Sequence, residues 1–410
     1  MNKKRLLVIG GGASGYMGAI TAAETNPHLE IFILEKSRQT LAKVKISGGG
    51  RCNVCNATEQ IPVLLKAYPR GGSFLKTIFK QFATKDTFTW FESRNVPLKI
   101  EPDGRVFPLS NSSETVVDCL EKSAKKLGIK VFYSSGVKKI VFENQQIKGV
   151  LLSDETFLDA DYLLATTGGG PQLNSYDWLS DTGHAIVPPV PSLFTFNAPH
   201  SLLLSLPGLS VNNVTVRISG TKLQNSGAFL ITHWGFSGPA VLVLSAKAAR
   251  ELANKTYDFS ILIDFTGGLG EKHLRETFDE WRKIHSKKQI HSHPQFQLPQ
   301  RLWSLLCDQA QISKEQKWED VSAKMTNKLV ENLLNYSEKI AGKTTFKDEF
   351  VTCGGVDLKQ IMPDTMESKR IKNLFFAGEL IDIDAVTGGY NFQAAWSTGY
   401  VAGKNIGNGV

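Results

Sequence analysis

The chain has 410 residues, 41% of them hydrophobic and 21% charged, with a formal net charge of +8 at pH 7. This length suits two or three domains, and the composition is that of an ordinary globular protein. Five cysteines, an odd number, argue against a disulfide framework and are typical of the reducing cytoplasm. No segment holds the roughly 18 uncharged apolar residues of a membrane helix, so we expect a cytoplasmic protein with no membrane partner.

The excess of Lys and Arg has two interpretations. Diffuse positive charge attracts anions in general, and the same charge would suit an RNA partner. The most basic helical region, residues 271–336, shows no stacking pattern of aromatic residues that interleaves with its charges. We therefore expect an anionic cofactor and a small-molecule substrate, and we do not favour a nucleic-acid partner. The sequence gives no signal for an oligomeric state.

The first 35 residues predict a βαβ unit with parallel strands. Residues 5–9 form an apolar strand pattern, and residues 10–15 (Gly-Gly-Gly-Ala-Ser-Gly) fit G-x-G-x-x-G at the start of a helical stretch. In this motif Gly10 permits the tight turn, Gly12 lets the backbone approach a pyrophosphate, and Gly15 lets helix and strand pack closely. The phosphates would lie on the N–H groups of the helix N-terminus.

An acidic residue follows at the spacing that a dinucleotide site requires. Glu35 ends the second strand pattern, residues 30–34, and lies 20 residues past Gly15. A carboxylate at this position accepts hydrogen bonds from the adenosine ribose. Because it disfavours a 2′-phosphate, the bound ADP half belongs to NAD or FAD. By themselves the glycines would be a weak signal, since glycines also mark simple turns.

After the first βαβ unit, the sequence predicts a loop, two helices and several short strands. Residues 36–57 are expected to form a Gly-rich, basic loop, followed by helices near 73–94 and 112–127, the second with Asn111 and Glu114 placed as a capping box. Short strands are expected at 129–133, 137–143, 147–152 and 156–158, and a buried strand at 161–166 ends in a glycine run.

Four prolines between residues 188 and 199 mark a domain boundary. Residues 191–265 are β-rich with a helix near 239–253, residues 271–336 are helical, and Gly-rich, apolar sequence returns near 346. We therefore expect one cofactor domain of residues 1–190 and 346–410, interrupted by an inserted substrate or cap domain of residues 191–345. Surface connections tolerate such insertions.

The last 40 residues hold a second strand–glycine–helix element. Residues 374–377 read as a strand ending at Gly378 and Glu379, and residues 387–391 (Thr-Gly-Gly-Tyr-Asn) open a helix. Glu379 would accept hydrogen bonds from a polyhydroxyl chain. The helix would direct N–H groups at N1 and the C2 carbonyl of a reduced flavin, which gain negative charge. A simple NAD domain has no need of this segment, whereas the ribityl chain and isoalloxazine ring of FAD do.

At these residues the chain resembles flavoproteins with two dinucleotide folds, and most closely the bacterial YhiN/BaiN-type flavoproteins, often labelled FAD-binding enzymes of the aminoacetone oxidase type. Four blocks carry the resemblance, at residues 8–15, 45–53, 232–239 and 351–393. The resemblance implies an α/β fold, a glutathione-reductase-like Rossmann-type FAD/NAD(P)-binding domain, interrupted by an inserted β-barrel and helical region.

The resemblance also implies that residues 47–53 line the FAD, that Val137 meets the adenine through its backbone, and that Thr167 and Gly168 lie near the ADP half. Together with the two glycine motifs, this gives the expected cofactor-binding residues: Gly10, Gly12, Ala13, Ser14, Gly15, Glu35, Lys36, Lys43, Ser47, Gly48, Gly49, Gly50, Arg51, Cys52, Asn53, Val137, Thr167, Gly168, Gly378, Glu379, Gly388, Gly389, Tyr390 and Asn391.

Several other residues have a functional and a structural interpretation. Cys52 and Cys55 make a C-x-x-C where the family pattern has Thr or Ser in place of Cys55; a redox disulfide is one interpretation, and packing of Cys52 in the loop is favoured. His233 would be a proton donor near the flavin or a loop histidine between a strand and a helix. Arg105 would bind a substrate carboxylate or lie in a surface turn.

Four further histidines, His273, His285, His291 and His293, lie in the basic region. They lack a neighbouring cysteine and a helical i, i+4 pair, so we expect no metal site.

These observations predict an FAD-dependent oxidoreductase. A single G-x-G-x-x-G leaves no separate NAD(P)H domain, so NAD(P)H, if it is the reductant, would dock transiently at the flavin face. The resemblance implies reduction of a C=C bond conjugated to a ketone in steroid-like acids, or oxidation of an amine. Two alternatives stay open: an FAD-dependent tRNA-modifying enzyme, which the positive charge would suit, and a flavin-binding redox sensor without turnover.

Overall fold

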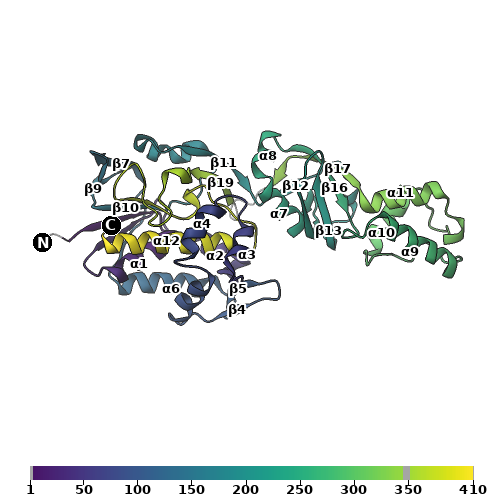
Figure 1. The fold of residues 1–410 in the computed structure, drawn as a ribbon, viewed down its shortest axis with the longest axis horizontal. Helices are drawn as coiled ribbons and strands as arrows, with labels where there is room; N and C mark the ends of the chain where they lie inside the picture. The colour runs from purple at the N-terminus through teal and green to yellow at the C-terminus, as the bar shows by residue number, and fades with distance from the viewer. Residues whose placement is uncertain (1–2, 345–350, 410) are drawn as a thin grey trace. The chain divides into compact units, whose positions relative to one another are not determined.

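A computed structural model of the chain describes residues 3–344 and 351–409. The chain divides into two compact units, one of Met1–Ser192 with Lys347–Val410 and the other of Leu193–Phe346 (Figure 1). The first division lies two residues from the one expected at 190/191. The expected return at residue 346 lies outside the described residues.

The first unit is built on a five-stranded sheet in which all neighbouring strands are parallel. The strand order is β20 (Leu374–Phe376), β10 (Tyr162–Ala165), β1 (Arg5–Ile9), β2 (Glu30–Leu34) and β6 (Lys130–Phe132). Four of the strands, β1, β2, β10 and β20, are short apolar runs that are almost entirely buried, as a parallel sheet covered by helices requires, whereas the edge strand β6 is largely exposed. The sheet therefore joins strands from both ends of the chain.

Two helices from opposite ends of the chain, α1 (Ala13–Thr25) and α12 (Tyr390–Asn408), lie side by side (Figure 1). Their backbones touch: a Cβ atom added to Gly399 would lie 2.5 Å from the Ser14 carbonyl oxygen, and one added to Gly403 would lie 2.2 Å from the Gly18 carbonyl oxygen. The contacts advance along both helices in the same direction, so the helices are parallel and both N-termini face the same way.

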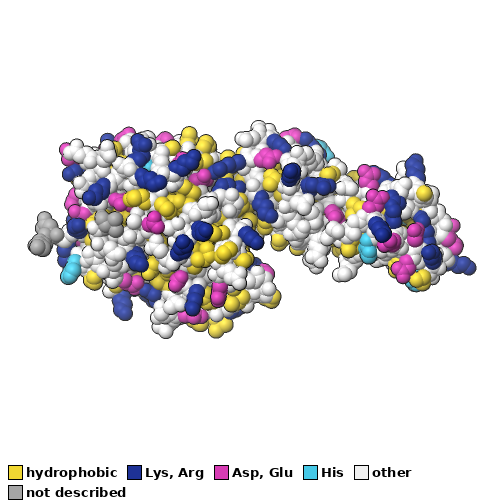
Figure 2. All heavy atoms as spheres, in the orientation of Figure 1, with side chains coloured by type: hydrophobic (Ala, Val, Ile, Leu, Met, Phe, Trp, Pro, Cys, Tyr) yellow, Lys and Arg dark blue, Asp and Glu magenta, His cyan; other side chains and the backbone are white. Residues whose placement is uncertain are grey.

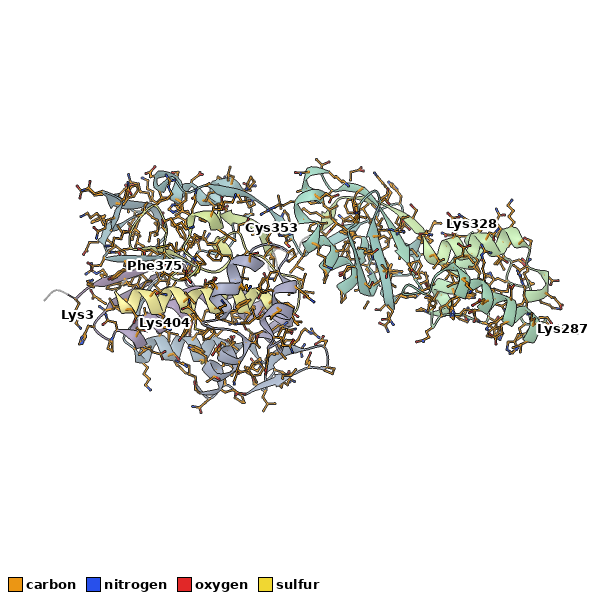
Figure 3. All side chains as sticks on the ribbon, viewed as in Figure 1. Lys3, Lys287, Lys328, Cys353, Phe375 and Lys404 are labelled. Atoms are coloured by element: carbon orange, nitrogen blue, oxygen red, sulfur yellow. The ribbon has the colours of Figure 1, made fainter. Side chains whose placement is uncertain are left out.

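The remaining elements of the first unit are short. The helices are α2 (Ala42–Gly50), α3 (Ile61–Leu64), α4 (Gly72–Phe79), α5 (Thr84–Glu92) and α6 (Ser113–Lys126), with 3-10 turns η1 (Leu65–Ala67), η2 (Leu173–Thr182), η5 (Leu358–Gln360) and η6 (Gly378–Leu380). The small antiparallel sheets contain β3 (Cys55–Asn56), β4 (Leu98–Ile100) and β5 (Arg105–Pro108); β7 (Val137–Glu143), β8 (Gln146–Leu152) and β9 (Phe157–Asp159); and β11 (Ile186–Ser192) with β19 (Val351–Val356). Figure 3 places Cys353 on β19 and Phe375 on β20.

Two local predictions were wrong. The expected loop at 36–57 contains α2, whose last turn departs from helical geometry at Ser47, Gly48 and Gly49. The capping box of Asn111 and Glu114 does not form. Helix α6 is capped at Ser112 without a side-chain hydrogen bond, and Glu114 instead pairs with a lysine of α2. Asn111 adopts a left-handed conformation, φ 55°, so the helix begins one residue later than the pattern indicated.

The second unit contains a seven-stranded sheet and a helical part. The strand order is β17 (Tyr336–Ala341), β16 (Asp258–Asp264), β13 (Ser210–Ile218), β14 (Gln224–Ile231), β15 (Gly235–Ser237), β12 (Thr195–Asn197) and β18 (Lys343–Thr344). The helices are α7 (Pro239–Lys247), α8 (Ala249–Asn254), α9 (Glu271–Ile284), α10 (Gln300–Gln309) and α11 (Ala323–Leu334), with 3-10 turns η3 (Leu202–Ser205) and η4 (Trp318–Asp320). The β-rich half and the helical half thus follow the predicted order, while closure of the sheet into a barrel stays a prediction.

Among the residues that the structure describes, no helix is long and apolar enough to cross a membrane. The same residues contain no group of three or more His, Cys, Asp or Glu side chains placed to hold a metal ion. His291 instead bonds the carbonyl of Ile312 through Nε2 at 2.9 Å, and the ring of His285 packs against Trp281.

The glycine contacts between α1 and α12 give a first prediction. Gly403→Ala should destabilise the protein by about 1–3 kcal/mol, because its methyl group would overlap a backbone carbonyl that cannot rotate away. Lys404→Ala is the control, since Lys404 is exposed on the same helix (Figure 3). Chemical denaturation of both variants measures the difference, and equal stabilities would contradict the close packing.

A buried histidine gives a second prediction. His184 bonds Thr182 and Ser368 through its two ring nitrogens, each at 2.8 Å. Burial, with a smaller effect of Arg370, lowers its pKa from 6.5 to about 4. The unfolded chain binds this proton more tightly than the folded one. The contribution of neutral His184 to the free energy of unfolding is therefore fully present above pH 6.5, and the free energy of unfolding falls as the pH drops towards 4, by up to about 3 kcal/mol.

His184→Gln should flatten this part of the pH dependence, which unfolding curves at pH 7 and pH 5 would measure. His28→Gln is the control because His28 is exposed. An unchanged pH dependence in the His184 variant would contradict the assignment.

Candidate cofactor-binding site

Two glycines of the first motif are required by the packing of the protein itself. Gly10 has φ 105°, and a Cβ atom there would lie 2.6 Å from the Thr166 carbonyl oxygen. A Cβ atom on Gly15 would lie 2.2 Å from the Gly10 carbonyl oxygen. These glycines shape the turn between β1 and α1 and bring helix and strand together, as the motif predicts.

Gly12 is different, because nothing in the chain requires a glycine there. Its backbone is extended, φ −93°, and it is the N-cap of α1. A Cβ atom on it would meet no atom within 4 Å. Space is therefore open directly over the start of α1, where the first N–H groups have no partner within the helix. A pyrophosphate lying against the backbone would account for the glycine.

Of the other glycines whose added Cβ atom would meet no atom within 4 Å, three are predicted cofactor residues. Gly49 and Gly50, at the end of α2, and Gly168, after β10, would present a Cβ atom to no atom within 4 Å. Next to Gly168, the Cα atom of Thr167 would lie 2.9 Å from a Cβ atom on Gly10. The turn after β10 therefore lies beside the first glycine turn. These residues fit a long ligand that passes close to the backbone.

The predicted adenosine side of the site is formed by residues at the ends of β2 and β7. Glu35 accepts hydrogen bonds through Oε2 from the Gly11 N–H at 2.9 Å and through Oε1 from the Ser37 N–H at 2.8 Å. Its carbonyl accepts from the Ser135 N–H at 2.8 Å, which brings the turn before Val137 next to Glu35. A Cβ atom on Gly136 would lie 3.7 Å from that of Lys36.

An ion pair joins two predicted cofactor residues from opposite ends of the chain. Lys43 Nζ lies 2.8 Å from Glu379 Oε2, and Glu379 Oε1 accepts a hydrogen bond from the Thr352 N–H at 2.7 Å. A Cβ atom on Gly378, which has φ 73°, would lie 2.3 Å from Ser14 Oγ at the start of α1. The C-terminal glycine segment thus lies directly beside the first helix start.

The N-terminus of α12 is held by two asparagines of the N-terminal half. With its amide oriented to satisfy both polar atoms, Asn53 accepts a hydrogen bond from the Gly389 N–H at 2.9 Å and donates one to the Cys55 carbonyl at 2.9 Å. Asn56 Nδ2 donates to the Gly388 carbonyl at 3.2 Å. Because a Cβ atom on Gly389 would lie 2.3 Å from the Cys55 oxygen, this close approach requires a glycine.

The side chains of two predicted ligands, Asn53 and Asn391, are therefore occupied by the protein. Besides Asn53, Asn391 bonds both backbone groups of Ala385, at 2.9 Å to the N–H and 3.2 Å to the carbonyl. The carbonyl of Tyr390 accepts from the Tyr68 hydroxyl at 2.8 Å. What the first turn of α12 offers a ligand is its backbone N–H groups and the positive end of its dipole.

The parallel packing of α1 and α12 sets the spacing of their two N-termini. Ser14, the second residue of α1, lies against Gly399, the tenth residue of α12. At 1.5 Å per residue, α12 therefore begins roughly 12 Å beyond the start of α1 along the shared axis. A ligand that reaches both helix starts would carry its pyrophosphate and its electron-rich ring at the two ends of a linking chain.

Arg51 and Arg105 share one carboxylate. Arg51 Nη1 lies 2.7 Å from Glu101 Oε1, and its guanidinium lies 3.9 Å from the centre of the Phe107 ring. Arg105 pairs with Glu101 at 3.2 Å and with Asp103 at 2.7 Å. Arg105 is thus engaged at the surface, and its binding of a substrate carboxylate stays a prediction.

The two cysteines of the C-x-x-C are buried. Burial raises the pKa of the Cys52 thiol to about 12, against the smaller effect of a hydrogen bond with Ser47. Burial likewise raises the pKa of the Cys55 thiol far above its ordinary value. Because only the thiolate attacks a disulfide or an electrophile, these groups are poorly suited to redox exchange, which supports the packing interpretation.

His233 lies in the second unit, in the exposed turn between β14 and β15. The turn joins two strands and not a strand and a helix, which corrects that part of the expectation. A role of His233 at the flavin stays a prediction.

The sequence analysis missed the polar residues that support the site. Three of them, Asn56, Tyr68 and Arg70, bond residues 384–390, and the fourth, Asp384, is the partner of Arg70. The available signal was Asp384, one of two acidic residues that alternate with apolar residues in 381–386, because a charge among apolar residues indicates a buried group with a partner.

The fold is that of a Rossmann-type dinucleotide-binding protein, in which two parallel helices, α1 and α12, begin on the same side. Over residues 4–405 the chain matches the family described as HI0933-like protein Rossmann domain. The chain belongs to this family, which confirms the predicted family, the Rossmann fold class and an FAD-dependent oxidoreductase.

Curated relatives cover nearly the whole chain. The 3-dehydro-bile acid delta(4,6)-reductase of Clostridium scindens is 27% identical, over 98% of this chain and 98% of its own length. The ribosomal RNA dihydrouridine synthase of Haemophilus influenzae is also 27% identical, over 98% of each chain. Among solved structures, the 3-ketosteroid delta1-dehydrogenase of Sterolibacterium denitrificans superposes with a TM-score of 0.52 and 12% identity over 99% of both chains, which shows the shared fold.

Gly12 gives the sharpest test of the site. We expect Gly12→Ala to fold with unchanged stability, because the methyl group enters open space, and to bind FAD at least tenfold more weakly, an estimate that corresponds to about 1.4 kcal/mol of lost pyrophosphate contact. Gly10→Ala is the contrast and should lose stability instead. Flavin absorbance after purification and FAD titration of the apoprotein measure both, and wild-type FAD affinity in the Gly12 variant would contradict this site.

Proposed function

We propose that this protein uses FAD to reduce a carbon–carbon double bond conjugated with a carbonyl group. When bound, FAD supplies the hydride chemistry, and the protein supplies position and electrostatics. The observation that carries the proposal is the fixed N-terminus of α12, whose N–H groups and dipole favour the negative charge of a reduced flavin ring. The FAD-binding residues predicted above form part of this proposal.

The two curated relatives support the type of bond. By their names, one acts on a 3-dehydro-bile acid with delta(4,6) unsaturation, where the ring double bond is conjugated with the 3-oxo group. The other makes dihydrouridine in ribosomal RNA, which requires saturation of the uracil double bond next to a carbonyl. For this chain we propose that hydride adds to the carbon β to the carbonyl and a proton to the α carbon. The names of the two relatives imply the same type of bond in very different substrates. The relatives therefore support the proposed bond type and not a particular substrate.

Residues of this chain would act by position and charge. Asn53 and Asn56 hold the start of α12, and the Lys43–Glu379 ion pair joins the two chain segments near which the ribityl hydroxyls would bind. His233 is proposed as the proton donor and Arg105 as a carboxylate-binding residue. Because the described chain offers one G-x-G-x-x-G, NAD(P)H is proposed to dock transiently at the flavin face.

We propose a small conjugated ketone as the first substrate class, in line with the sequence analysis. A uracil base in RNA is the second, favoured by one observation. Residues 193–346 contain 18 Lys and Arg against 13 Asp and Glu, so the inserted unit carries most of the net positive charge, and Lys287 and Lys328 lie in its helical part (Figure 3). On the face shown in Figure 2, however, basic and acidic side chains are interspersed, without the continuous basic surface typical of a nucleic-acid site.

Anaerobic kinetics separate these possibilities. We expect NADH or NADPH to bleach the flavin band, and a conjugated enone acid to restore it, with a product 2 Da heavier as expected for adding two hydrogens. Unmodified ribosomal RNA, with mass analysis of its uridines, is the parallel arm. Reoxidation by RNA and not by enones would select the second class, and reoxidation by neither, or by a saturated ketone equally well, would overturn the proposed bond type.

A further inference from the structure

A buried ion pair lies in the segment that leads into α12, residues 381–389. Asp384 is fully buried. Its Oδ1 accepts from Arg70 Nε at 2.6 Å, its Oδ2 from Arg70 Nη2, and Ser192 Oγ donates to Oδ2 at 2.7 Å. The Arg70 side chain is 11% exposed and makes a two-pronged contact that fixes the planes of both groups.

The contact ties together three distant parts of the chain. Arg70 immediately precedes Gly71, the N-cap of α4, and Asp384 lies six residues before α12. Ser192 ends the N-terminal segment of the first unit, where the chain passes into the inserted unit. The backbones of Arg70 and Asp384 also form an antiparallel bridge.

Residues 67–71 contact the segment that leads into α12 at further points. The Val386 N–H donates to the Ala67 carbonyl at 2.9 Å, and Tyr68 donates to the Tyr390 carbonyl at 2.8 Å. A Cβ atom on Gly71 would lie 2.4 Å from Ile383. Residues 67–71 therefore hold residues 383–390 in one position through several contacts.

Stability alone does not explain the choice of charged residues. Removing two charges from water costs several kcal/mol for each ion, and replacing such a pair with apolar residues of similar volume is often neutral or stabilising. What a two-pronged Arg–Asp contact provides, and apolar packing does not, is a defined orientation of the backbone at Asp384.

We propose that Arg70 and Asp384 are positioning residues that orient the entry segment of α12, and thereby aim the N–H groups of its first turn at the flavin pyrimidine. Ser192 completes this contact and fixes the end of β11 to the same segment. This inference rests on the proposed FAD site, and it adds a function for residues that touch no cofactor. The pair acts on the redox balance of the flavin through the helix end, because a helix dipole acts within its first turn.

The test compares Asp384→Asn, which keeps the shape, with the double variant Arg70→Met/Asp384→Leu, which replaces the pair with apolar side chains. We expect the double variant to unfold at a temperature similar to that of the wild type. In both variants we expect the preference of the site for reduced over oxidised FAD to fall roughly fivefold to tenfold. A tenfold change equals about 30 mV in the two-electron midpoint potential, measured against a reference dye.

A second readout does not need FAD. Amide hydrogen exchange of residues 384–392 in the apoprotein should be faster in both variants. Arg70→Lys, which keeps the charge, should show only part of each effect. Arg94→Met is the matched control because Arg94 pairs with Glu24 elsewhere on the first unit. A stable double variant with wild-type potential and wild-type exchange would overturn the inference. A wild-type chain that fails to bind FAD would overturn the proposed function, while faster exchange in the variants would still support the positioning role.

Discussion

The contact between the backbones of α1 and α12 is the constraint on which the site depends. Gly399 and Gly403 bring α12 so close to α1 that even a methyl group would overlap a carbonyl oxygen. Helices at this separation cannot slide or rotate independently, because their facing surfaces are backbone and not flexible side chains. The parallel direction and the step of roughly 12 Å between the helix starts follow from this one contact, and with them the distance between the two ends of the ligand that fits.

Beside these two helices, several polar side chains hydrogen-bond to the single segment 381–391. Residues 381–391 carry few groups of their own that would bind a cofactor, yet they are held by Asn53, Asn56, Tyr68 and Arg70 from the N-terminal half. Preorganised N–H groups stabilise developing charge without having to reorient during the reaction. The supporting residues therefore matter to the chemistry although they lie behind the surface that would meet the flavin.

The charges of the molecule bear on the substrate more than on the fold. The inserted unit holds most of the net positive charge, and the curated relatives include one named for a bile acid and one named for ribosomal RNA. A common bond type reconciles these relatives, because hydride addition next to a carbonyl places the same demands on the flavin domain in both. The inserted unit is then where substrates would be distinguished, since the flavin domain supplies the shared part of the reaction.

The sequence by itself determined the first βαβ unit, the roles of Gly10 and Gly15, the position of Glu35 and the return of the C-terminal segment to the cofactor domain. These features are local: each depends on strand and helix periodicity or on a glycine at a fixed spacing. Only the tertiary structure decided that Asn53 and Asn391 use their side chains to hold backbone, that Lys43 meets Glu379, and that Arg70 and Asp384 form a buried pair. Most of these contacts join residues more than 300 positions apart. Side-chain partners at that separation are set by tertiary packing, which produces no periodic pattern in the sequence.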